Sequence, residues 1–238
     1  MKRIDKNKQI KLNGLTCLVQ NDPVFESLRG YGMYVDILQA IKDQLDAILS
    51  CCKVVRVYRF DLRAKKGFCL PSDNRTASTF IKRLTAKVQR IQSNTEFRYV
   101  WVREQEANNV NQHYHFVLMM DSALYLSRRQ LKALVKSIEQ SLGVSVWWCK
   151  ANESQAYNSF PTSNKLVAVN TSINRKAYLR EVFRLSYLAK VRTKDNCLRG
   201  DNVNDYSSSQ SNANANSTWQ PYVDEKQTLT ASLFDALT

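Results

Sequence analysis

Apolar residues recur along this chain with two different periods, which separate predicted helices from predicted strands. In four stretches they return every three or four residues, as on one face of a helix. The third of these stretches opens with capping-box spacing at Ser127 and Gln130 and ends at Gly143. The predicted helices cover residues 33–51, 80–91, 127–142 and 173–191.

Between these helices lie short segments rich in β-branched and aromatic residues, which are typical of strands. They predict strands at residues 54–62, 97–106, 113–120, 144–148 and 166–169. An asparagine-rich turn joins the second and third strands into a β-hairpin. Because the strands do not alternate regularly with helices, we expect an α+β fold with an antiparallel β-sheet and helices packed on one face.

Length and composition predict one domain with appendages. The chain has 238 residues, of which 44% are hydrophobic. Residues 1–30 are basic and broken by glycine and proline, so we expect an N-terminal arm without chemistry. Residues 196–238 are rich in asparagine and serine and are expected to form a disordered tail. The functional domain is therefore predicted at residues 31–195.

The charge of the chain points to a polyanionic partner. The formal net charge is +14 and the isoelectric point is near 9.6, which favours nucleic acid. The six cysteines have neither metal-ligand nor disulfide-framework spacing. Since the sequence contains no apolar run long enough to cross a membrane and no secretion signal, we expect a cytoplasmic protein without a membrane partner.

The two histidines of the chain, His113 and His115, lie two residues apart in a predicted strand. Side chains at this spacing point to the same face, so both imidazoles can approach one metal ion. Symmetric closure of the hairpin would pair Glu106 with His113 and Glu104 with His115, which adds a carboxylate. Such a mixed set suits Mg²⁺ or Mn²⁺ and is capable of holding Zn²⁺. The alternative is a pair of core histidines hydrogen-bonded to acids.

Strand transfer on a phosphodiester also needs a nucleophile, and a tyrosine can form a covalent phosphotyrosine. Tyr187 has Lys190 three residues later, on the same face of the last predicted helix. Tyr178 lies on the opposite face, so only one of the two tyrosines can face the metal. The alternative role for Tyr187 is that of an aromatic core residue.

Four segments together resemble the HUH endonucleases of rolling-circle replication, and more closely the YagK/YfjJ family of inovirus gene-two-type replication proteins. They are the His-Tyr-His strand, residues 97–106 (Phe-Arg-Tyr-Val-Trp-Val-Arg-Glu-Gln-Glu), residues 57–62 (Val-Tyr-Arg-Phe-Asp-Leu) and residues 186–190 (Ser-Tyr-Leu-Ala-Lys). The similarity extends over residues 53–194. The fold that it implies is an HUH/RRM-like palm.

The resemblance implies a metal-dependent nickase in which His113 and His115 bind the metal. Glu104 is the preferred third ligand and Glu106 stays open. Tyr187 is the implied nucleophile and Lys190 its helper. The chain lacks the second tyrosine of two-tyrosine initiators and has glutamine in place of the usual proline before the first histidine.

We therefore expect a phage or prophage replication initiator that nicks and joins single-stranded or hairpin origin DNA through a 5′-phosphotyrosine. A host helicase and a host polymerase are the expected protein partners, and the polymerase would extend the free 3′-hydroxyl. Arg56, Arg59 and Lys82 are candidate DNA contacts, Trp147 or Trp148 is a candidate base platform, and Asp61 is expected to be a structural acid.

Two alternatives for the function are a non-cleaving DNA-binding prophage regulator and a relaxase or transposase with the same chemistry. A separate hypothesis concerns residues 227–234, whose Gln…Leu-Phe pattern loosely resembles peptides that bind the bacterial sliding clamp.

Overall fold

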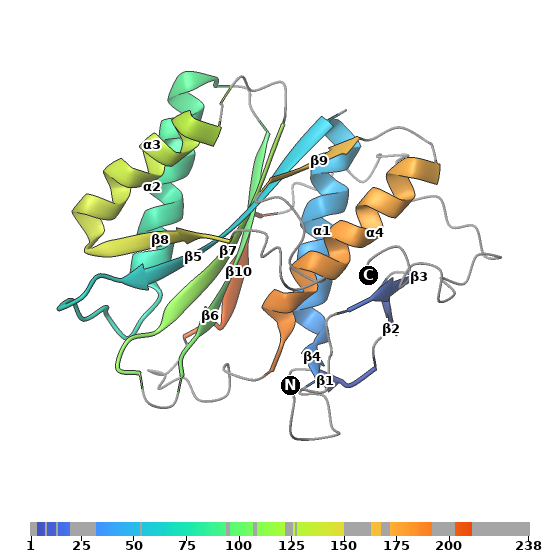
Figure 1. Cartoon of the computed structure of the whole chain (residues 1–238), viewed down its shortest axis with the longest axis horizontal. Helices are drawn as coiled ribbons and strands as arrows, with labels where there is room; N and C mark the ends of the chain where they lie inside the picture. The colour runs from blue at the N-terminus through green and yellow to red at the C-terminus, as the bar shows by residue number, and fades with distance from the viewer. Residues whose placement is uncertain are drawn as a thin grey trace.

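A six-stranded antiparallel sheet forms the middle layer of the molecule (Figure 1). The structure is a computed structural model, and it describes residues 4–7, 9–12, 14–19, 32–52, 54–93, 96–106, 109–121, 126, 128–149, 163–167, 172–191 and 203–210. Five strands follow the order β10 (Tyr206–Ser208), β6 (Phe97–Glu104), β7 (His113–Asp121), β5 (Val54–Ala64) and β8 (Val144–Trp148). A sixth strand, β9 (Ser163–Val167), pairs with the first half of β5 and β8 pairs with its second half.

Two helices cover each face of this sheet. Helices α1 (Val35–Cys51) and α4 (Ser172–Ser186) lie on one side, and α2 (Arg75–Ile91) and α3 (Arg128–Leu142) lie on the other (Figure 1). The predicted α+β class with an antiparallel sheet is confirmed, but the expectation that helices cover one face is wrong. Helices lie on both faces because the central strands carry apolar side chains on both faces, and both sets must be buried.

Strand β5 illustrates how the two faces differ. Val55 and Val57 point to the core that α1 and α4 complete, whereas Tyr58, Phe60 and Leu62 point to the core under α2 and α3. All five side chains are at most 2% exposed. Residues of β5 with odd numbers therefore share the α1/α4 face, and the same rule assigns the polar side chains of the candidate site to a face.

The ends of the described chain contain more structure than the sequence predicts. Strands β2 (Gln9–Leu12) and β3 (Leu15–Leu18) form a hairpin whose buried side chains join the α1/α4 core, and β1 (Ile4–Asp5) pairs with β4 (Met33–Tyr34). Strand β10 corrects the prediction of a wholly disordered tail, because its backbone bonds to β6 complete an edge of the sheet. Residues 227–234 lie outside the described residues.

The last helical segment changes its geometry where the candidate nucleophile lies. Helix α4 ends at Ser186, and a 3₁₀ turn, η2 (Tyr187–Ala189), follows it. The predicted helix over 173–191 therefore ends in a tighter turn. No helix among the described residues is long and apolar enough to cross a membrane.

Candidate metal centre

Three neighbouring strands carry the polar side chains of the site. Glu104 is the last residue of β6, His113 is the first residue of β7, and His115 follows two positions later. Asp61 comes from β5, where its Cα pairs with that of His115. Because side chains alternate along a strand, all four lie on the α1/α4 face of the sheet.

The register of the β6–β7 hairpin differs from the predicted one by two residues. Glu104 pairs with His113, and His115 pairs with Val102. The predicted pairs of Glu106 with His113 and Glu104 with His115 are therefore wrong. The strands stop pairing at Glu104, and the side-chain amide of Gln105 bonds backbone carbonyls of the turn instead. Glu106 is exposed beyond the end of the strand.

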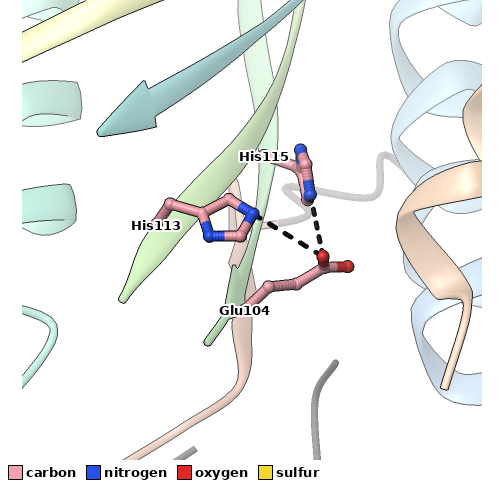
Figure 2. A group of neighbouring side chains, drawn as sticks. All are labelled: Glu104, His113 and His115. Atoms are coloured by element: carbon pink, nitrogen blue, oxygen red, sulfur yellow. Dashed lines mark hydrogen bonds and ion pairs between the residues drawn. The ribbon is translucent and has the colours of Figure 1, made fainter. Parts of the chain in front are cut away.

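Figure 2 shows both imidazoles turned toward the carboxylate of Glu104. Its Oε2 atom lies 3.0 Å from Nε2 of His115 and 3.7 Å from Nε2 of His113. The candidate ligand atoms of the three residues lie within 4.8 Å of one another. Two imidazoles and one carboxylate form a mixed nitrogen and oxygen donor set. Glu104, His113 and His115, which we call the metal group, could therefore hold a metal ion.

The two histidines differ in their protonation. Burial and the neighbouring His115 lower the pKa of His113 to about 4, so its imidazole is neutral at pH 7 and offers a lone pair. Burial alone would lower the pKa of His115, but the carboxylates of Glu104 and Asp61 outweigh burial and raise it. The two carboxylates therefore favour positive charge at His115, and a bound metal ion would also supply positive charge there.

Asp61 orients the buried imidazole of His115. Its Oδ1 lies 2.5 Å from Nδ1 of His115, which leaves Nε2 directed to Glu104. Burial opposes ionisation of Asp61, but the bond to His115 and the nearby Arg59 bring its pKa below the ordinary range. A carboxylate on the far nitrogen is the usual support of a histidine ligand. The sequence alone predicts only a structural role for Asp61, and the pairing of β5 with β7 is what brings its carboxylate to His115.

Tyr187 lies beside this group. The centroid of its ring is 5.7 Å from that of His115, and the rings are perpendicular. Cζ of Arg59 lies 4.2 Å and Nζ of Lys190 lies 4.7 Å from the centre of the same ring. Burial raises the pKa of Tyr187 despite Arg59. The two cations are thus placed next to the phenol.

Other candidates lie elsewhere. The hydroxyl of Tyr178 donates a 2.6 Å hydrogen bond to Asp46 of α1, as expected for a tyrosine on the opposite face. Arg56 has an even number in β5 and thus faces away from the metal group, and Lys82 is exposed on α2. Trp148 packs against Tyr58 and Phe60.

Trp147 belongs to the same face as the metal group. Its Cα pairs with that of Asp61, and its side chain is 64% exposed. Of the two candidate base platforms, Trp147 is thus the more exposed, since Trp148 is half-buried.

Comparison with known families covers the whole site. The family model of the YagK/YfjJ C-terminal domain matches residues 21–202. The chain belongs to this family. Its members are related to prophages, so this is a prophage-related protein. The matched range includes every residue of the site and ends before β10.

The other comparisons add no functional information. No curated protein matches the chain. One solved structure, a hydantoinase/carbamoylase family amidase from Burkholderia ambifaria, is 13% identical with a TM-score of 0.27. The match covers 71% of this chain and 39% of the amidase. A similarity this low carries no argument about fold or activity.

Proposed function

We propose that this protein is a replication initiator of a prophage or phage, of the HUH endonuclease type, which nicks and rejoins single-stranded or hairpin origin DNA. One observation carries the proposal: Tyr187 lies beside His115, with 5.7 Å between the centroids of the two rings. His115 belongs to the group that could hold a metal. A nucleophile and a site for a phosphate-binding cation thus occur together. A histidine pair with purely structural bonds would not need the tyrosine.

Glu104, His113 and His115 would hold Mg²⁺ or Mn²⁺, and such an ion neutralises charge on a phosphodiester. The hydroxyl oxygen of Tyr187 attacks the phosphorus and the bond to the 3′ oxygen breaks. The phenol proton ends on that oxygen, so the products are a 5′-phosphotyrosine and a free 3′-hydroxyl. Reversal rejoins the strand without an external energy source.

Cations next to Tyr187 support this chemistry. Because burial raises the pKa of the phenol, the phenolate needs positive charge near it. Arg59 and Lys190 supply such charge, at 4.2 Å and 4.7 Å from the centre of the ring. The same cations suit the phosphate of an entering strand.

The free 3′-hydroxyl would serve a host polymerase behind a host helicase. The clamp-binding hypothesis for residues 227–234 stays a separate proposal, and failure of a tail peptide to bind the clamp would remove it.

The test is a denaturant-resistant adduct between protein and labelled single-stranded DNA from its own element, with Mn²⁺ or Mg²⁺. Tyr187→Phe removes the nucleophile, His113→Ala removes a ligand, and Tyr178→Phe is the matched control. We expect the adduct in wild type and in the control, and its loss in the other two variants. DNA binding without any adduct would favour the non-cleaving regulator. Strand insertion or mobilisation assays distinguish a transposase or relaxase.

A further inference from the structure

Positive charge is concentrated in the helical layer on the other side of the sheet from the metal group. Helix α2 carries five basic residues and no acidic one, and α3 carries four basic residues and one acidic one. These two helices therefore contribute +8 of the formal charge of +14. On the opposite face, α1 carries three acidic residues and one basic residue, and α4 carries four basic residues and one acidic residue, so these two helices together contribute +1. Most of the net positive charge of the four helices thus belongs to the α2/α3 face.

We call the described cations of these helices the basic layer, which consists of Arg75, Lys82, Arg83, Lys87, Arg90, Arg129, Lys132 and Lys136. All but Lys87, which is half-buried, are exposed. Arg75 pairs with Asp73, and Lys136 pairs with Glu139. Within the described part of the chain, Lys87, Arg90 and Arg129 make no ion pair. A merely solvated helix face would have acidic partners interspersed.

An open groove runs along α2. It has a volume of about 410 Å³ and lies between α2, the edge strand β10 and its neighbour β6. Its polar lining comes from Ser78, Lys82, Thr85, Gln89, Tyr99 and Ser207. Hydroxyl, amide and ammonium groups are the side-chain donors that contact phosphate oxygens in protein–DNA complexes. The groove therefore extends the basic layer with uncharged donors.

We propose that the basic layer binds the phosphates of duplex DNA, on the face of the sheet opposite to the metal group. A helix of 17 residues is about 25 Å long, most of the roughly 34 Å of one duplex turn. Helices α2 and α3 lie side by side, so together they present cations over a surface that is wider than one extended DNA strand would cover. This inference deepens the proposed function: the duplex next to the nick site would be held on one face and the cleaved strand on the other.

The test measures binding of a fluorescein-labelled duplex of about two helical turns to the full chain by anisotropy, without metal and over a series of salt concentrations. The variant Arg90→Gln/Arg129→Gln removes one exposed cation from each helix. The matched control Lys6→Gln/Lys11→Gln removes two exposed cations near the N-terminus, outside the basic layer.

If each lost cation gives up one phosphate, the slope of log affinity against log salt falls by about 1.8, and affinity at 0.15 M salt falls about 30-fold. The control keeps the wild-type slope. An unchanged slope in the double variant, or an equal loss in the control, overturns the proposal. The proposal is also overturned if the double variant loses more affinity for a single strand of equal length than for the duplex, because the surface would then serve single strands.

These outcomes are independent of cleavage. The anisotropy assay needs neither a metal nor Tyr187, so a protein that forms no adduct can still show the duplex surface. Conversely, an adduct on a short single strand together with unchanged duplex binding in Arg90→Gln/Arg129→Gln would support the nickase and refute the surface.

Discussion

Replacing Asp61 by asparagine is expected to weaken metal binding without removing a ligand. The carboxylate is 8% exposed at the residue level and its Oδ1 lies 2.5 Å from Nδ1 of His115. Loss of such a supporting partner costs about 10–100-fold in metal affinity, or about 1.4–2.7 kcal/mol. Because the amide of Asp61→Asn keeps an oxygen acceptor, we expect about tenfold, the lower end of this range.

The pH dependence of this loss has a definite sign. Glu104 and Asp61 raise the pKa of His115, and a metal must displace the proton from its ligand nitrogen. Below that pKa, wild-type affinity therefore falls by about tenfold per pH unit. Asp61→Asn removes one cause of the raised pKa, so the proton competes less in the variant. The affinity deficit of the variant should be largest at pH 8 and smaller at pH 6.

Calorimetric titration with Mn²⁺ at both pH values measures these affinities. The matched control is Asp43→Asn, an exposed aspartate of α1 whose partner is the amide of Gln39 at 2.7 Å. We expect wild-type affinity from the control. Wild-type affinity of Asp61→Asn at pH 8, or a deficit that grows toward pH 6, would refute the orienting role of Asp61.

Three further predictions concern stability and are measured by urea unfolding. Phe116→Ala removes a side chain with no exposed surface and should cost about 3–5 kcal/mol; a loss below 1 kcal/mol would contradict its place in the α2/α3 core. Gly143→Ala should cost about 1 kcal/mol or more, because φ is +63° and the new Cβ would lie 2.6 Å from the ring of Phe68, and Phe68→Ala in the same chain should recover only part of it. Tyr178→Phe should cost about 1 kcal/mol through its bond to Asp46, and an unchanged midpoint would argue against that bond.

The elements of the fold follow from local patterns, but their arrangement does not. The strand at 144–148 and the third helix match β8 and α3 within one residue. The helices on both faces could have been inferred from the continuous apolar run of β7, which is typical of a strand buried on both sides. Helix α2 begins at Arg75, before its predicted start, because its first turn buries only the small Thr76 and Ala77, whose apolar signal is weak.

The sequence does not predict strand β10, for a related reason. Its residues, Tyr206–Ser208, are mostly polar and lie in a segment poor in apolar residues. Such a strand forms because the edge of β6 offers unpaired backbone groups, which is a property of the partner and not of the segment itself.

The candidate site divides in the same way between local and non-local information. The shared face of His113 and His115 follows from their spacing alone. Asp61 is 54 residues away from His115 in the chain, and only the pairing of β5 with β7 brings the two together. Tyr187 depends on the packing of α4 and η2 over the α1/α4 face, which the helical pattern does not specify.

The hairpin register explains why the predicted group of donor residues forms despite an incorrect pairing. The predicted and observed pairings differ by two residues, which is one full period of a strand, so Glu104 stays on the face of the histidines. The difference changes the paired residue of Glu104 from His115 to His113 and leaves Glu106 beyond the end of the strand. A shift of one residue would have placed Arg103 or Gln105 beside the imidazoles and moved the carboxylates to the α2/α3 face. The same alternation directs Tyr114 and Phe116 into the core under α2 and α3, so one strand both supplies the two candidate histidine ligands and anchors the layer that carries the cations.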